Sequence, residues 1–341
     1  MASPAFEPSA HQGTLHHITQ YVYAFEYAPQ SSSASTISPH KNILLFPTSL
    51  AAHLPPHWRL ARLALSSSGE AWGTKSLRSD AEEILKCVRY FRSLYQASAD
   101  HGGGGDGDRG EGGSEAGGKV VLMGHSTGCQ DIMEYLVGGS NATLQHALPS
   151  PPFATTDPID GAILQAPASD REGLAITTTA EQLSQAIASA REFVAKGRPR
   201  ELLSRELTRE AFGPAPLSAA RFLAVVSPGP EHEGEDDYFS SDFGAERLEA
   251  TFGKVPVRTR LLVLYSGKDE YVPVTTDKGA LVGRWRRVVK EKGGTWDEDG
   301  GVIEGAKHGV DGEGNEPAVE DLCSRVVGML GRVEGRLGGH L

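Results

Sequence analysis

Short apolar runs, each followed by a loop and then by a longer stretch of helical periodicity, recur along this chain. The runs that we expect to form strands span residues 42–46, 63–67, 120–123, 162–165, 261–265 and 302–304, and less regular candidates lie within residues 16–27. Strands that alternate with helices in this way pair in parallel, and helices cover both faces of the sheet. The alternation therefore predicts an α/β protein with a mostly parallel central sheet.

Two of the expected helices carry their own start signals. Ser79 and Glu82 have the spacing of a capping box, and apolar residues then recur on one helical face at positions 84, 88, 91 and 95. A second capping-box pattern runs from Thr179 to Gln182. Both patterns predict helices that start at these residues.

The region of the second capping box, residues 170–243, contains helical signals and no strand pattern. We predict that it is a helical cap inserted into a core formed by residues 14–169 and 244–335. Caps of this kind form substrate pockets and exclude water, so substrate specificity is expected here. The alternative is a helical bundle that only covers the sheet.

A glycine-rich, charged stretch occupies residues 102–118, between an expected helix and the following strand. It holds too few apolar side chains to offset the entropy cost of ordering its backbone. We predict a disordered surface loop. Glycine loops that bind phosphate lie between a strand and the helix after it, whereas this stretch lies before a strand, so it is not expected to bind phosphate.

The sequence GHSTG, from Gly124 to Gly128, matches the pattern G-x-S-x-G. It follows the apolar run at residues 119–123 and precedes a helical stretch at 129–137, which is the strand–turn–helix context that the pattern requires. The turn holds the serine hydroxyl at the carboxyl end of the strand, and the glycines avoid side-chain collisions with the strand and the helix. This combination predicts an α/β-hydrolase fold with Ser126 as the nucleophile.

A serine hydroxyl reacts only if a general base takes its proton, and the base needs a group that fixes its tautomer. In this fold the order along the chain is serine, acid, histidine, with the acid and the histidine in loops that follow strands. His308 and Asp269 each follow an expected strand in this order. We predict that His308 is the base for Ser126 and that Asp269 orients the histidine.

Two other carboxylates compete for the role of the acid. Asp170 also follows an expected strand, but it opens the helical region and could cap a helix there. Glu270 is the direct neighbour of Asp269. Asp269 is preferred because it lies before a Val-Pro turn directly after the penultimate strand, and Asp170 is kept as the alternative acid.

Two backbone N–H groups normally stabilise the oxyanion in this fold. Thr127, at the expected start of the helix, supplies one of them. The second comes from the loop after Phe46, where Pro47 has no N–H, so Thr48 or Ser49 is the expected donor. Loss of one such donor slows catalysis by roughly 10² to 10³, so an imperfect loop predicts a slow enzyme.

Composition excludes several other classes of function. Hydrophobic residues make up 39% of the 341 residues, and no run approaches the ~20 consecutive apolar residues of a membrane-spanning helix. The first twenty residues lack a targeting pattern, so we expect a soluble, cytoplasmic protein. A formal net charge of -11 argues against nucleic acid as a partner, because nucleic-acid binding depends on clustered lysine and arginine.

Neither a metal nor a cofactor is expected. The three cysteines, Cys87, Cys129 and Cys323, lack the spacing of a zinc site or a disulfide set, and we expect free buried thiols. Two prolines separate His53 from His57 and prevent the helical geometry of a zinc-binding pair.

Five segments together resemble a fungal and plant α/β-hydrolase family of largely unknown function, which includes the intracellular fungal esterases that open fusarinine-type siderophores. They span residues 72–77, 121–131, 160–167, 236–242 and 265–270, within a resemblance that extends from about residue 42 to residue 330. The chain departs from the family in the loop after Phe46, where a glycine-rich Gly-Gly-Leu sequence with a further Asp-Gly is usual.

The resemblance implies hydrolase activity with Ser126, Asp269 and His308 as the triad, and it makes a siderophore ester the first substrate to test. The residues and the resemblance together predict a serine esterase that works through an acyl-enzyme on a small-molecule ester. Hydrolysis of an amide or a thioester would use the same groups. The alternative from another class is a non-catalytic or weakly active protein that binds a small molecule beneath the cap.

Overall fold

The computed structural model describes residues 11–28, 42–45, 50, 52–100, 118–138, 157–229, 234–310 and 314–335. The predicted oxyanion donors Thr48 and Ser49 lie outside these residues. The predicted disordered loop at residues 102–118 also lies outside them, apart from Gly118.

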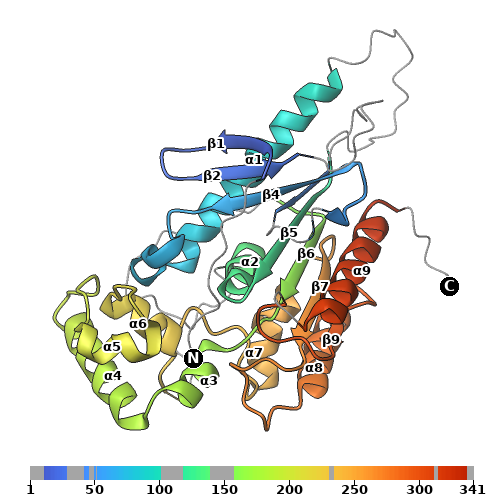
Figure 1. The fold of residues 1–341 in the computed structure, drawn as a ribbon. Coiled ribbons are helices and arrows are strands. Elements are labelled where there is room, and N and C mark those ends of the chain that lie inside the picture. The colour runs from blue at the N-terminus through green and yellow to red at the C-terminus, as the bar shows by residue number, and fades with distance from the viewer. Residues whose placement is uncertain are drawn as a thin grey trace.

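Nine strands of the described residues form a sheet at the centre of the molecule (Figure 1). Its strands are β1 (Gly13–His17), β2 (Tyr23–Tyr27), β3 (Asn42–Leu45), β4 (Trp58–Ala64), β5 (Val120–His125), β6 (Gly161–Gln165), β7 (Arg260–Ser266), β8 (Thr295–Trp296) and β9 (Gly301–Ile303). The order is β1-β2-β4-β3-β5-β6-β7-β8, and β9 also pairs with β7. The pairs β1–β2 and β2–β4 are antiparallel, and the others are parallel.

Helices lie between most of the successive parallel strands along the chain. They are α1 (Leu77–Asp100), α2 (Thr127–Val137), α3 (Asp170–Thr177), α4 (Ala180–Ala195), α5 (Arg205–Phe212), α6 (Ala219–Val226), α7 (Ala245–Ala250), α8 (Lys278–Glu291) and α9 (Glu316–Val333), with short 3₁₀ helices η2 (Gly69–Thr74) and η3 (Phe252–Lys254). Within the described part of the chain, none of these helices combines the length and the apolarity needed to cross a membrane.

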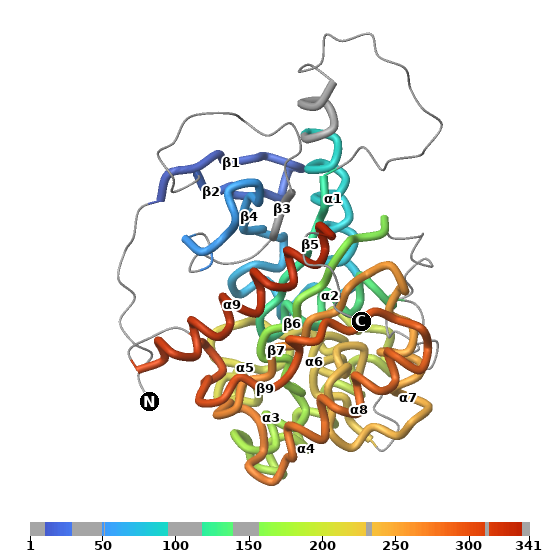
Figure 2. The backbone as a smooth tube through the Cα atoms, turned by 90° about the vertical axis from the view of Figure 1, so that its right-hand side faces the viewer, coloured from blue at the N-terminus to red at the C-terminus, as the bar shows by residue number. Residues whose placement is uncertain are grey.

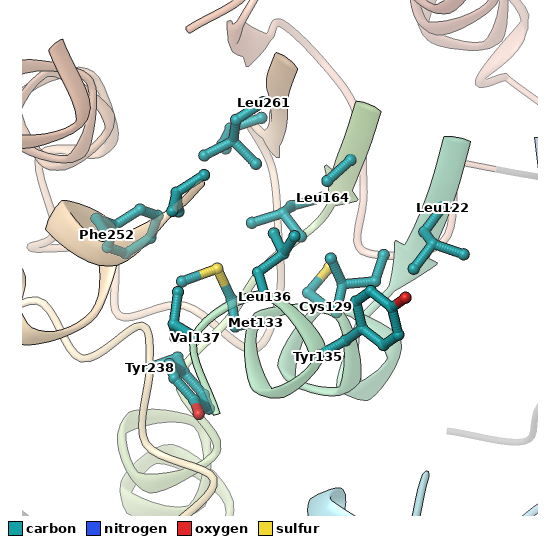
Figure 3. Close-up of a cluster of buried hydrophobic side chains, with 14 of the residues drawn as sticks. Leu122, Cys129, Met133, Tyr135, Leu136, Val137, Leu164, Tyr238, Phe252 and Leu261 are labelled. Carbon is teal, nitrogen blue, oxygen red and sulfur yellow. The ribbon is translucent and has the colours of Figure 1, made fainter. Parts of the chain in front are cut away.

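Alternate residues of the buried strands pack against different helices. Leu122 and Leu164 face α1, α2 and α8, whereas Val121 and Ile163 face α9. Figure 3 shows part of the first face, where side chains of α2 lie beside Leu164 and Leu261 of the neighbouring strands. Helices therefore cover both faces of a mostly parallel sheet, as the sequence pattern predicts, and this part of the prediction is confirmed.

Helices α3 to α6 form a group of their own, apart from the helices that cover the sheet (Figure 1), and in the turned view of Figure 2 they lie in the lower half of the molecule. A separate buried cluster holds apolar side chains of these helices, such as Leu174, Ala186 and Phe222, together with Leu217 from the segment before α6. In α4 the predicted capping box is present: the Thr179 hydroxyl accepts from the Gln182 N–H, and the Gln182 side chain accepts from the Thr179 N–H.

Two local predictions were wrong. The strand expected at residues 63–67 is β4, Trp58–Ala64, and it starts five residues earlier because Trp58 and Leu60 supply the buried positions that pack under α9. Helix α1 starts at Leu77, so Ser79 lies inside its first turn. The Ser79 N–H donates to the Ser76 hydroxyl at 3.2 Å, and the Ser76 N–H donates to the Ser79 hydroxyl at 3.3 Å.

The turn between β5 and α2 holds Ser126 in a backbone conformation that non-glycine residues rarely adopt, with φ 55° and ψ -125°. Gly124 makes this turn possible, since a Cβ there would lie 2.1 Å from the carbonyl oxygen of Gly128. At Gly128 itself an added Cβ would meet no atom within 4 Å. The expectation that both glycines avoid collisions is therefore correct for Gly124 and wrong for Gly128, which borders open space.

Because their surroundings differ, Gly124 and Gly128 are expected to differ in their tolerance of an alanine side chain. Gly124→Ala is expected to destabilise the protein by roughly 1–3 kcal/mol or more, because a methyl group must displace backbone. Gly128→Ala is expected to leave stability unchanged or raise it by up to about 1 kcal/mol, because alanine favours the helix over glycine. Urea denaturation of both variants measures the difference, and equal losses would contradict the asymmetry.

Candidate active site

The fold brings the three predicted side chains into hydrogen-bond distance of one another. Ser126 lies at the turn after β5, Asp269 in the loop after β7, and His308 in the loop after β9. His308 Nε2 lies 2.8 Å from Ser126 Oγ, and His308 Nδ1 lies 2.8 Å from Asp269 Oδ2. A neutral histidine with its proton on Nδ1 donates to Asp269 and accepts from the Ser126 hydroxyl. Such an arrangement can pass a proton from serine to histidine.

Asp269 is almost fully buried and its second oxygen is also held. The residue is 5% exposed, and Oδ1 accepts the backbone N–H of Tyr271 at 3.0 Å. The loop itself is fixed by Lys278, whose ammonium group donates to the carbonyls of Ser266 and Gly267 at 3.2 and 2.8 Å. The carboxylate is therefore held by its own loop, and its other oxygen, Oδ2, accepts the hydrogen bond from His308 Nδ1.

The competing carboxylates make other contacts. Asp170 Oδ2 accepts from Gln130 Nε2 at 2.9 Å, and burial raises the pKa of Asp170 to about 6. Glu270 accepts the backbone N–H of His308 at 3.0 Å. Asp269, not either of these, is the carboxylate at the His308 ring.

Hydrogen bonds fix the backbone carbonyl of His308 as well as its backbone N–H. His125 Nε2 donates to the His308 oxygen at 3.0 Å, and Gln165 Nε2 approaches the same oxygen at 3.4 Å. His125 and Gln165 are register partners at the ends of β5 and β6. The backbone of His308 is thereby tied to two strand ends and to Glu270, which fixes where its imidazole can lie.

Thr127 is the first residue of α2, so its N–H has no acceptor within the helix. The group lies next to the Ser126 hydroxyl in the chain and at the positive end of the helix dipole. An N–H at this position is typical of an oxyanion donor. The second predicted donor, Thr48 or Ser49, belongs to the part of the chain that is not described.

A cavity of about 810 Å³ opens beside these residues. Its lining includes Ser126, Thr127 and His308 from the sheet edge, and Leu174 and Phe212 from the α3–α6 group. The ring of Tyr271 meets the His308 imidazole edge-on, with 4.8 Å between the ring centroids. Residues of the sheet edge and of the α3–α6 group therefore both line the cavity.

One end of this cavity carries buried charges that the sequence analysis missed. Arg221 of α6 is 4% exposed and donates to Asp236 at 2.5 Å and to the carbonyl of Trp72 at 3.0 Å. Asp80 and Asp131 line the same cavity, the positive charge of Arg221 acts on both, and their side chains are hydrogen-bonded to each other. A sequence signal was present, since both acids lie on helices among residues that pack inward, but the partners come from segments far apart in the chain.

The three cysteines are buried and free, as expected. Cys129 lies under the turn, where its thiol donates to the carbonyls of Gly124 and Gln165. Among the described residues, no group of three or more histidine, cysteine, aspartate or glutamate side chains has the geometry to hold a metal ion.

Comparison with known proteins extends over nearly the whole chain. A family model described as "Protein of unknown function (DUF1749)" matches residues 5–331. The chain is 36% identical to the fusarinine C esterase of Aspergillus fumigatus, over 93% of this chain and 95% of that protein. Among solved structures, it resembles the siderophore hydrolase EstB from Aspergillus fumigatus with a TM-score of 0.73 and 31% identity, over 96% of this chain and 100% of that one.

A more distant structure, an alpha/beta hydrolase fold protein of unknown function, matches with a TM-score of 0.51 and 15% identity, over 95% of this chain and 98% of that one. This likeness concerns the fold alone. It agrees with the parallel sheet, the covering helices and the strained turn at Ser126. The chain therefore belongs to the DUF1749 family and has the α/β-hydrolase fold.

Proposed function

We propose that this protein is a serine hydrolase that cleaves carboxylic esters through an acyl-enzyme. Ser126 attacks the ester carbonyl, and His308 accepts the serine proton and then protonates the leaving alcohol. Asp269 holds the histidine tautomer and stabilises the imidazolium that forms. Water, activated by the same histidine, releases the acyl group.

The observation that carries this proposal is the pair of 2.8 Å contacts from His308 to Ser126 and to Asp269. The two contacts involve the two different nitrogens of one imidazole, which is the requirement for a base that is itself oriented. The strained turn supports the assignment, because strain at a non-glycine residue persists only where the surrounding structure enforces it.

Negative charge develops on the carbonyl oxygen when Ser126 attacks. The N–H of Thr127, at the first turn of α2, is the proposed donor for that oxygen. Thr48 and Ser49 remain the proposed sources of the second donor. No metal or cofactor is required for these steps, because serine, histidine and backbone N–H groups supply the nucleophile, the base and the oxyanion contact.

For the substrate we propose a siderophore ester of the fusarinine type. The name of the Aspergillus fumigatus relative, fusarinine C esterase, at 36% identity, supports this choice. A cavity of about 810 Å³ is large enough for a substrate of drug size or above. We further propose that residues 170–243 act as a cap on a core of residues 14–169 and 244–335, since α3, α5 and α6 supply part of the cavity wall.

The nucleophile is tested with a fluorophosphonate probe and short p-nitrophenyl esters. Wild type is expected to be labelled, and Ser126→Ala is expected to lose the label and to lower kcat by roughly 10⁴ to 10⁶, since the acyl-enzyme cannot form. Intact-protein mass spectrometry and ester hydrolysis measure the two effects. Folded wild type that takes no label would favour a non-catalytic binding protein instead.

The choice of acid is tested with a matched pair of amide variants. Asp269→Asn is expected to lower kcat by about 10⁴, because asparagine favours the wrong histidine tautomer. Asp170→Asn is expected to keep kcat within about tenfold of wild type, since Asp170 contacts Gln130 and not the imidazole. Steady-state kinetics on one ester decides between them, and a reversed order would make Asp170 the acid.

The hydrogen bond that holds the His308 carbonyl is tested by substitution of its donor, His125, which we propose to be a positioning residue. His125→Leu removes the donor to the His308 carbonyl and is expected to lower kcat about tenfold with little change in KM, because alignment and not substrate binding is lost. His125→Gln, which keeps a donor, is expected to recover most of the rate. An equal loss in both variants would show that the hydrogen bond does not position the histidine.

A further inference from the structure

Tyr271 is an aromatic residue of the cavity wall that has no task in the proposed mechanism. It lies in the loop after β7, two residues beyond Asp269, and it lines the same cavity as Ser126 and His308. The residue is 47% exposed, so much of it is accessible to a bound molecule. An aromatic side chain in this position can contact a substrate whose ester lies at the serine.

The backbone of Tyr271 is held on several sides. Its N–H donates to Asp269 Oδ1 at 3.0 Å, and the next residue, Val272, is buried in the core. The Tyr271 carbonyl lies against α3, where a Cβ added to Gly173 would come within 3.2 Å of the carbonyl oxygen. The tyrosine ring therefore projects from a backbone whose position is fixed by the core, by the acid and by α3.

The Tyr271 ring contacts the imidazole of His308. The two ring centroids are 4.8 Å apart and the ring planes meet at 75°, which is a favourable edge-to-face arrangement. The two nitrogens of the imidazole are engaged by Asp269 and Ser126. The tyrosine thus borders the proposed base without competing for either nitrogen.

The proposed mechanism brings the leaving alcohol to this imidazole. His308 protonates the alcohol oxygen, so that oxygen must come within roughly 2.6–3.2 Å of His308 Nε2. The carbons attached to the oxygen then lie beside the imidazole. Among the described residues, two rings that line the cavity contact the imidazole, those of His125 and Tyr271. His125 is hydrogen-bonded to the His308 carbonyl, and Tyr271 is the more exposed of the two.

We propose that Tyr271 is a specificity-determining residue that binds the alcohol half of the ester. The class of alcohol that it selects has a planar, apolar group on the carbon next to the oxygen, because such a group can pack on an aromatic ring and leave water. Gly173 and Thr177 share one face of α3, line the same cavity and have small side chains, which leaves room beside the tyrosine. The proposal rests on the proposed esterase function and names the class of its leaving group.

The test compares benzyl acetate with methyl acetate. The two esters share their acyl group, and their alcohols have similar acidity, so the ratio of their kcat/KM values reports contacts to the alcohol half. Wild type is expected to prefer benzyl acetate about tenfold or more. Tyr271→Ala is expected to bring the ratio close to that of the methyl ester alone, within about twofold of one, whereas Tyr271→Phe keeps the ring and is expected to keep the ratio.

A matched control lies in the same loop. Val274 is fully exposed and is not among the described residues that line the cavity, so Val274→Ala is expected to keep the wild-type ratio. Because both esters are measured on one preparation of each variant, the ratio does not depend on the fraction of enzyme that is folded. If Tyr271 only positioned His308, Tyr271→Ala would slow both esters equally, because both need the same base.

Acyl transfer tests the same contact in the reverse direction. The acetyl-enzyme formed from p-nitrophenyl acetate can react with an added alcohol in place of water. The alcohol oxygen bonds to the acyl carbon as the bond to Ser126 Oγ breaks, and the alcohol proton passes through His308 to Ser126 Oγ. The accepting alcohol occupies the place of the leaving alcohol. At equal concentrations, wild type is expected to form benzyl acetate about tenfold faster than methyl acetate, and Tyr271→Ala is expected to lose this preference.

The outcomes separate this proposal from the esterase assignment. A preference that is present in wild type and Tyr271→Phe and lost in Tyr271→Ala supports the role of the ring. A wild-type ratio near one in either assay, a ratio that Tyr271→Ala leaves unchanged, or a ratio that Tyr271→Phe loses as well overturns that role and leaves the esterase standing. Wild type that hydrolyses none of the three acetates overturns both, since no leaving alcohol is then formed.

Discussion

The parallel alignment of β5, β6, β7 and β9 is the constraint on which the candidate site depends. Each of these strands ends at the same edge of the sheet, so the residues after them meet although they lie far apart in sequence. Ser126 and His308 are 182 positions apart and Asp269 and His308 are 39 apart, and each pair approaches to 2.8 Å. The same edge also anchors the backbone of His308 through His125 and Gln165.

The turn at Ser126 shows how backbone geometry and the cavity are linked. Gly124 allows β5 and α2 to approach closely enough for the strained serine conformation, whereas Gly128 contributes by having no side chain where the cavity begins. One motif thus contains two glycines with different physical roles. The first is a packing requirement of the fold, and the second leaves space that a substrate can occupy.

The buried carboxyl groups cost stability that apolar side chains would not cost. In natural proteins, local violations of packing and polar pairing concentrate at functional sites, where the unfavourable arrangement serves binding or chemistry. Asp80, Asp131 and Asp236 line the cavity that Ser126 also lines. Arg221, which ties α6 to Asp236 and to Trp72, also joins the helical group to the core.

The sequence by itself determined the fold class, the turn at Ser126 and the three residues that converge there, because these depend on strand periodicity and on the order of motifs along the chain. It did not determine the start of β4, the cap of α1, the hydrogen bonds to the His308 backbone or the buried charged residues that line the cavity. Those depend on contacts between segments such as α1, α2 and α6, whose proximity no local pattern encodes. Side-chain pairing across distant elements is decided only when the chain packs, and tertiary structure alone therefore revealed it.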